Sequence, residues 1–201
     1  MTILNMTRRL TVRTQASIGL ALVLATAVMA GQARNVGAPE VFNANAQVKG
    51  KTGAGAAALQ IHIDRYTPDA DRTAVETALK QGGYANFLNA LRKAPEVGRV
   101  QVGERQFPIR WSRQTSNKDG GRTIVVVTDK PIFYVGGGSA DAKPRAGYEV
   151  GLIQMTVDGV GFGSGTMAGA ARIRPGGEAG VQVDDYADEP IKLVTVSRLM
   201  K

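Results

Sequence analysis

The sequence lacks the side chains on which most metal-binding and nucleophilic chemistries depend. Its 201 residues include no cysteine and a single histidine, His62. Without cysteine there is no disulfide, no thiolate nucleophile, no zinc site with cysteine ligands and no cysteine to carry a lipid. With one histidine, metal sites built from several histidines are excluded as well. We therefore expect no metal and no other cofactor, although carboxylate chemistry remains open.

Aromatic residues and strong charge are also scarce. Phe, Trp and Tyr make up 5% of the chain, which is little for a protein that holds sugars or bases by stacking. The formal net charge is +8, but three arginines among the first 13 residues contribute to it without any neighbouring acid. The 22 basic and 17 acidic residues that follow leave a net charge of +5. A positive charge this modest does not indicate a nucleic-acid-binding protein.

A long hydrophobic run is missing too. Basic residues precede residues 16–30, which are 15 uncharged residues rich in alanine. A transmembrane helix needs about 20 apolar residues, so we expect no permanent membrane span. A basic segment, a short apolar segment and then small residues are typical of a secretory signal, with cleavage after Ala30 or Ala33. We predict that residues 1–33 are a signal peptide and that the protein is exported, either to the periplasm or to the medium.

The segment that follows is poor in large apolar residues. Residues 34–58 consist mainly of small and polar residues, a composition that cannot bury enough surface to offset the chain entropy lost on folding. Gly50, Lys51 and Thr52 match the end of a phosphate-binding loop, but Asn45 stands where that motif needs its first glycine. We therefore predict a flexible Ala/Gly-rich linker over residues 34–58.

Regular structure is expected over residues 59–201, in a single β-rich domain. Residues 59–66 alternate apolar and polar side chains, as in a half-buried strand. A helix then follows from Pro68 to Gln81, and after two glycines a second helix covers residues 84–94. These two helices are expected to form a short helical hairpin near the start of the domain.

The rest of the domain has the pattern of a β-sheet. Short apolar runs alternate with Gly, Pro, Asn and Asp, which are turn residues. Residues 124–127 are apolar at four consecutive positions, so their strand should be buried on both faces. We predict an α+β fold that is mainly an antiparallel β-sheet, either a sandwich or a partly closed barrel. The strands are expected at residues 99–102, 107–114, 122–129, 132–135, 148–158, 166–174, 181–186 and 191–198.

Three segments of the domain are similar to a known group of proteins. They are residues 82–93 (GGYANFLNALRK), residues 122–132 (RTIVVVTDKPI) and residues 185–193 (DYADEPIKL). From about Thr67 onward, the chain resembles an uncharacterised group of exported bacterial proteins with no known function. The resemblance implies a bacterial envelope context and no particular chemistry.

Basic side chains form the first candidate site. Arg110, Arg113 and Arg122 lie on two consecutive predicted strands, and Lys143 and Arg145 lie in a glycine-rich loop. Guanidinium groups bind phosphate, sulfate and carboxylate through paired hydrogen bonds. We predict that these five residues bind an anionic envelope component, either a lipid headgroup or a polysaccharide. The alternative is a solvated sheet face and an ordinary flexible loop.

Acidic side chains form the second candidate site. His62 and Asp64 share one face of a predicted strand, where the imidazole could act as a base beside a carboxylate. Asp184, Asp185 and Glu189 belong to an acidic run near the C-terminus, which supplies oxygen ligands but lacks the spacing of a calcium loop. No nucleophile is marked beside either group.

The function most consistent with these observations is a non-enzymatic one. Because nucleophile, metal and cofactor motifs are missing, we expect a binding or structural domain of the cell envelope. The alternative is a carboxylate-dependent hydrolase that uses some of Asp64, Asp184, Asp185 and Glu189, with His62 as a base. Export argues against nucleic acid as a partner. The oligomeric state stays open at this point.

Overall fold

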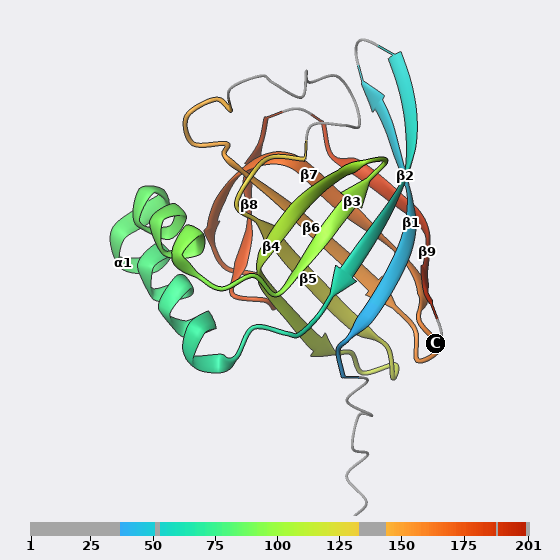
Figure 1. Ribbon diagram of the computed structural model, residues 1–201, viewed down its shortest axis with the longest axis horizontal. Coiled ribbons are helices and arrows are strands. Elements are labelled where there is room, and N and C mark those ends of the chain that lie inside the picture. The colour runs from blue at the N-terminus through green and yellow to red at the C-terminus, as the bar shows by residue number, and fades with distance from the viewer. Residues whose placement is uncertain (1–36, 51–52, 133–143, 188, 200–201) are drawn as a thin grey trace, which may run out of the picture. The chain divides into compact units, whose positions relative to one another are not determined.

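The computed structural model describes residues 37–50, 53–132, 144–187 and 189–199 (Figure 1). The predicted signal peptide, residues 1–33, lies outside this part of the chain. The described residues form nine β-strands and one α-helix, and every pairing between these strands is antiparallel. Among these residues, no helix is both long enough and apolar enough to cross a membrane.

Eight of the described strands close into a barrel, and the ninth extends it. In chain order they are β1 (Glu40–Gly50), β2 (Gly53–Ile63), β3 (Gly98–Val102), β4 (Arg105–Ser116), β5 (Arg122–Thr128), β6 (Val150–Val157), β7 (Phe162–Pro175), β8 (Val181–Tyr186) and β9 (Ile191–Arg198). The ring runs β6-β5-β4-β3-β2-β1-β9-β7, and β7 pairs with β6 to complete it. β8 lies outside the ring and pairs with the C-terminal end of β7.

The barrel is fully closed, which differs from the predicted sandwich or partly closed barrel. β7 is 14 residues long and pairs with both β6 and β9. A Cβ atom at Gly163 would lie 1.8 Å from the backbone oxygen of Thr156, and one at Gly165 would lie 2.4 Å from that of Gln154. These glycines therefore let β6 and β7 approach closely. The mainly antiparallel β-fold is confirmed, and the expectation of an open or two-layer sheet is wrong.

Residues 40–50 form a strand, so the predicted flexible linker over residues 34–58 is wrong in its described part. β1 pairs with β2 along its whole length. Phe42, Ala44 and Ala46 are buried, and polar residues alternate with them. Alanine is small enough to pack inside the barrel here, so a segment poor in large apolar residues still has the two-residue period of a strand.

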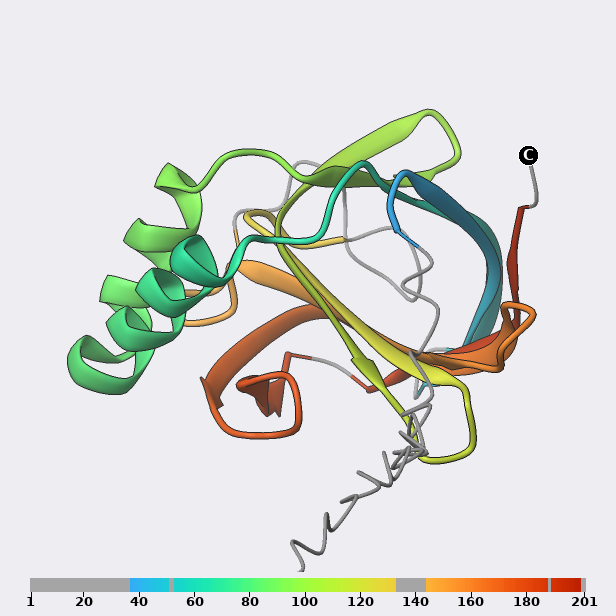
Figure 2. The same cartoon turned by 90° about the horizontal axis from the view of Figure 1, so that it is seen from below.

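The helix α1 (Asp69–Lys93) lies outside the barrel, against one side of it (Figure 2). It is one helical element in which Gly83 is non-helical, with φ 67° and ψ −169°. Glycine adopts this conformation at little steric cost, so the glycine pair bends the helix instead of ending it. The predicted helical hairpin near the start of the domain is therefore wrong: one kinked helix follows two strands, β1 and β2.

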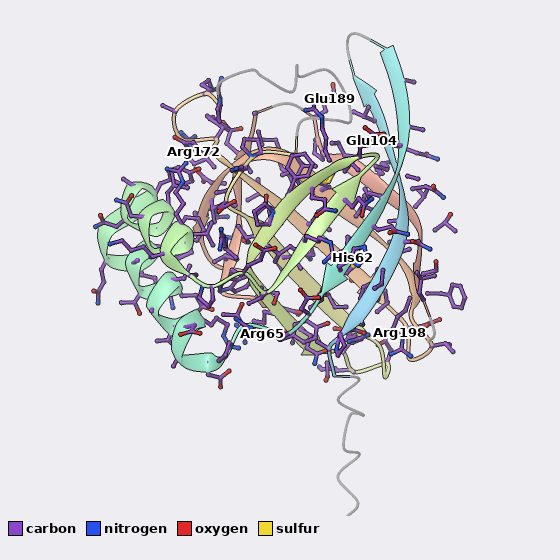
Figure 3. The ribbon with its side chains drawn as sticks, viewed as in Figure 1. His62, Arg65, Glu104, Arg172, Glu189 and Arg198 are labelled. Atoms are coloured by element: carbon purple, nitrogen blue, oxygen red, sulfur yellow. The ribbon has the colours of Figure 1, made fainter. Side chains whose placement is uncertain are left out.

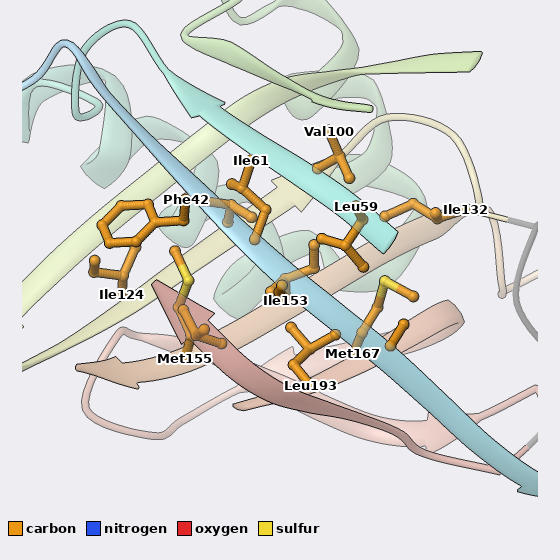
Figure 4. Packing of buried hydrophobic residues seen from close by; sticks show 14 of the residues in the cluster. Phe42, Leu59, Ile61, Val100, Ile124, Ile132, Ile153, Met155, Met167 and Leu193 are labelled. Carbon is orange, nitrogen blue, oxygen red and sulfur yellow. The ribbon is translucent and has the colours of Figure 1, made fainter. Parts of the chain in front are cut away.

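Apolar side chains form two buried layers, one inside the barrel and one between the barrel and α1. In Figure 4 the inner side chains converge from strands around the barrel. β5 contributes to both layers, because Ile124 and Val126 belong to the inner one and Val125 and Val127 to the outer one. The prediction that this strand is buried on both faces is confirmed.

The other predicted strands mostly agree with the structure. β3 to β9 correspond to seven of the eight strands expected after residue 98. The exception is residues 132–135, because Ile132 lies outside any strand and residues 133–135 are not described. The strand expected at residues 59–66 is β2, which begins earlier, at Gly53.

Candidate functional site

Arg122, one of the five predicted anion-binding residues, is partly buried and forms ion-pair and hydrogen-bond contacts within the fold. Its side chain is 12% exposed, and its Nη1 and Nη2 atoms donate to the two carboxylate oxygens of Glu40 at 2.7 and 2.6 Å. Tyr66 donates to the same carboxylate, and Gln114 accepts from Arg122. Burial, together with Glu40, raises the pKa of Tyr66, so its hydroxyl stays protonated. Arg122 therefore ties the start of β5 to the start of β1.

A β-bulge in β4 changes which of its side chains share a face. Simple alternation would place Ile109, Trp111 and Arg113 on one side of the strand. The register with β5 shifts between Ile109 and Trp111, so Ile109 joins the inner apolar layer and Trp111 joins the outer one. The extra residue in the bulge reverses the direction of the side chains that follow it.

The other predicted basic residues also fail to form a common surface. Arg113 lies beside α1, whereas Arg122 lies at one end of the barrel interior. Lys143 lies outside the described residues. Each arginine has a partner: Arg110 with Asp129 (N–O 2.9 Å), Arg113 with Glu76 (4.0 Å) and Arg145 with the ring of Tyr148 (3.8 Å to its centre).

The acidic pair Asp184 and Asp185 is separated from His62, whereas Asp64 is close enough to His62 to influence its pKa. Asp184 and Asp185 lie on β8, where they pair with Arg172 and Arg174. His62 lies on β2, and β1, β9 and β7 stand between β2 and β8. Figure 3 shows His62 and Arg172 on different parts of the barrel. Within the described part of the chain, no three His, Asp or Glu side chains gather as metal ligands.

A groove crosses the outer surface of the barrel over β9, β1, β2 and β3. Its volume is about 560 Å³. Small residues, Ala58 and Gly103, leave space between longer polar side chains. The groove is lined by Asn43, Ala44, Asn45, Ala58, Leu59, Gln60, Gln101, Gly103, Thr195 and Ser197.

Polar side chains form a row across five strands, and four of these strands border the groove. In register, Ser197 of β9 is opposite Asn43 of β1, which is opposite Gln60 of β2. Gln60 is opposite Gln101 of β3, and Gln101 is opposite Gln106 of β4. We call these five residues the amide row. All of them lie on the outer face, since buried apolar residues alternate with them along each strand.

Hydrogen bonds determine which atoms of the amide row donate and which accept. Gln60 donates through Nε2 to Oδ1 of Asn43 at 3.1 Å, and Nε2 of His62 is 3.2 Å from Oε1 of Gln60. Because an amide oxygen only accepts, His62 donates here and carries a proton on Nε2. Neither the Asn43 amide nitrogen nor His62 Nδ1 has a hydrogen-bond partner among the described residues. Both atoms are available to a ligand.

Where β9 borders the groove, it contains a β-bulge with a strained residue. Its register with β1 shifts, because Asn43 is opposite Ser197 whereas Asn45 is opposite Val194. Thr195, inside the shift, has φ 55° and is the one non-glycine residue with positive φ in the described part of the chain. A β-branched side chain is strained in this region. Strain of this kind is concentrated at functional sites, and Thr195 is exposed in the groove.

Charge borders the groove on one side. Arg99 of β3 is opposite His62 of β2, and Arg99 forms no ion pair with any described residue. Partial burial and then the Arg99 charge lower the pKa of His62, while Asp64 opposes them. His62 is therefore neutral at pH 7. The residues that line the groove include no carboxylate.

A second hollow lies farther along β1, beside the start of β2. Its volume is about 660 Å³. Gln47 and Lys192 lie opposite each other in this hollow, and Gln47 follows Asn43 and Asn45 along the outer face of β1. Glu189 lines the same hollow, apart from the acidic pair on β8.

The sequence does contain a signal for this groove. Asn43, Asn45 and Gln47 alternate with apolar residues, as do Gln60 and His62. Each alternation predicts a polar strand face. What brings the two faces together is the pairing of β1 with β2, a segment that composition alone assigns to a linker.

Comparisons with protein-family models, with curated proteins and with solved structures find no match. The function is therefore inferred from the chemistry of the groove.

Proposed function

We propose that this protein is a non-enzymatic, exported domain of the bacterial envelope that binds a polysaccharide in the groove over β9, β1, β2 and β3. The observation that supports it is the amide row, in which five strands present hydrogen-bonding side chains side by side. Amides and hydroxyls donate and accept hydrogen bonds. A sugar chain presents hydroxyl groups that do both, so the two surfaces are complementary.

The shape of the groove suits an extended polymer. It lies on the outer face of the closed barrel, and a second hollow lies farther along β1, where Gln47 and Lys192 are found. A chain that follows β1 would contact Asn43, Asn45 and Gln47 in succession. Repeated weak contacts along a polymer add up to useful affinity.

Other ligand classes fit the groove less well. Its lining residues include no aromatic ring on which a nucleic acid base could stack. The arginines predicted to hold a lipid headgroup are engaged elsewhere in the fold. A polysaccharide is the ligand class that remains best supported.

Export is the part of the proposal that rests on sequence. The basic and apolar segments at the N-terminus are typical of a secretory signal, and the resemblance to exported bacterial proteins agrees with them. The destination is the periplasm or the medium, where envelope polysaccharides are found.

The alternative, a carboxylate-dependent hydrolase, has less support from the geometry. A glycoside hydrolase needs two carboxyl groups on either side of the bond that it cleaves. No carboxylate lines the groove, and Asp184 and Asp185 form ion pairs with arginines on β7. Binding without cleavage is the simpler reading.

Affinity electrophoresis through gels that contain single polysaccharides tests the proposal. We expect at least one neutral or acidic polysaccharide to retard the protein. In that gel, the double variant Asn43→Ala, Gln60→Ala should lose affinity by about tenfold or more, because two hydrogen-bonding groups of the row are removed. Circular dichroism checks that the fold is kept.

The matched control is the double variant Gln154→Ala, Thr156→Ala. These residues are exposed on the outer face of β6, away from the groove. Their replacement should leave the retardation unchanged. Equal loss in both double variants, or no retardation of the wild type by any polysaccharide, would contradict the proposal.

A further inference from the structure

Two cationic or ionisable side chains lie next to the amide row on the outer face of the barrel. Arg99 and His62 form a cross-strand pair in the row of residues adjacent to Gln60 and Gln101. Arg99 has no ion pair among the described residues, unlike Arg110, Arg113 and Arg122. A guanidinium group left free beside a hydrogen-bonding surface is a ready partner for an anion.

Resting on the proposed function, we infer that Arg99 and His62 form the subsite for the acidic group of a uronic-acid-containing polysaccharide, and that protonation of His62 strengthens this binding. The sugar hydroxyls contact the amide row, and the carboxylate lies at its border on Arg99. A planar guanidinium matches a carboxylate through two parallel hydrogen bonds.

His62 is hydrogen-bonded to the amide row through Gln60, and this contact determines which ring nitrogen is protonated. Its Nε2 donates to Gln60, so protonation occurs at Nδ1, which becomes a donor instead of an acceptor. The charged groups that face it are Arg99 from β3 and Asp64, which follows the end of β2, and its partner on β1 is the apolar Val41. A carboxylate bound at Arg99 would offset the charge that disfavours protonation of His62.

The sign of the pH dependence follows from these contacts. Partial burial and Arg99 lower the pKa of His62, so the free protein carries a neutral imidazole at pH 7.5. At about pH 5 the imidazole gains charge, whereas a uronate stays mostly ionised because carboxyl groups titrate near pH 4. Affinity for an acidic polysaccharide should therefore rise as the pH falls from 7.5 to 5.

Calorimetric titration of the protein with a short oligogalacturonate, and with a neutral galactose oligomer of equal length, tests the subsite. We expect the wild type to prefer the uronate by about tenfold, the worth of one charge-assisted pair. Arg99→Gln should bring the ratio of the two affinities close to one. Lys80→Gln, which removes an exposed cation on α1, is the matched control and should keep the wild-type ratio.

The role of His62 is tested in the same titration at pH 7.5 and pH 5. We expect the wild type to bind the uronate about threefold more tightly at pH 5, the scale of one exposed charge contact. His62→Gln keeps a donor for Gln60 and should remove this pH dependence. Because His62 is the one histidine of the chain, its ring resonance can be followed by NMR. By linkage, the uronate should raise the pKa of His62.

The outcomes separate this inference from the proposed function. If the neutral oligomer binds as well as the uronate, or if Arg99→Gln and Lys80→Gln behave alike, the acidic subsite is wrong and the polysaccharide groove stands. An unchanged His62 pKa on saturation with the uronate would overturn the role of His62. If vesicles with anionic headgroups bind through Arg99 and neither oligomer binds, both the subsite and the proposed function are wrong.

Discussion

Thr195 illustrates how a single residue marks the groove. Its φ of 55° places a β-branched side chain where glycine or asparagine is favoured. Because the side chain is exposed, packing does not explain why threonine stands there. Thr195 lines the groove together with Ser197 and Asn43, which favours a contact with the ligand as the reason.

Thr195→Asn should therefore stabilise the protein. Asparagine tolerates this backbone conformation, so the free energy of unfolding should rise by about 1 kcal/mol. Denaturant unfolding measures the change. Thr166→Asn, at an exposed position of β7 with ordinary backbone angles, is the control and should be neutral or slightly destabilising. A loss of stability in Thr195→Asn would show that the threonine is not strained.

Arg122→Met should destabilise the fold strongly. The substitution leaves Glu40, whose side chain is 3% exposed, as a buried charge without its main partner. Breaking a buried ion pair on one side costs about 3–5 kcal/mol. The double variant Glu40→Gln, Arg122→Met should recover most of this loss, because no charge is then left buried. If thermal melts of Arg122→Met match the wild type, Arg122 does not have the structural role that its contacts indicate.

At the scale of elements, local patterns predict the strands well and their partners poorly. The apolar and polar alternation in residues 107–114, 181–186 and 191–198 is local, and all three strands form. β1 is missed because its inward residues are partly alanine, whose burial depends on strands that are distant in sequence. The amide row is missed for the same reason. It is assembled from five strands, so no single segment contains it.

The kink of α1 at Gly83 can be tested by substitution. Gly83 has φ 67° and ψ −169°, a conformation that is nearly restricted to glycine. A Cβ atom there would have no atom within 4 Å, so the cost of Gly83→Ala comes from the backbone alone. We expect a loss of about 1–3 kcal/mol in the free energy of unfolding. Gln81→Ala, exposed two residues earlier, should be neutral. A more stable Gly83→Ala would mean that the kink is not required.

At the scale of the whole described domain, the two apolar layers share the same strands. β5 alternates between them, with Val126 in the inner layer and Val125 and Val127 in the outer one. Closure of the barrel also depends on β9, which joins β1 to β7. Loss of either layer would expose buried valines of β5 to water, so the two layers stabilise each other.

Unfolding should therefore be a single cooperative transition. Trp111 is the one tryptophan of the chain, and it lies buried in the outer layer between the barrel and α1. In guanidinium chloride, its fluorescence should change at the same midpoint as the far-ultraviolet circular dichroism. A fluorescence transition at lower denaturant would mean that α1 separates from an intact barrel.

The central claim is that the groove over β9, β1, β2 and β3 is where a polysaccharide binds. The most direct measurement is a map of backbone amide shifts by NMR as the protein is titrated with fragments of the polysaccharide that retards it most. The largest shifts should follow the amide row and Thr195, across strands that are adjacent only in the folded barrel. Shifts centred on Tyr148, Arg172 and β8, with the amide row unchanged, would contradict the claim.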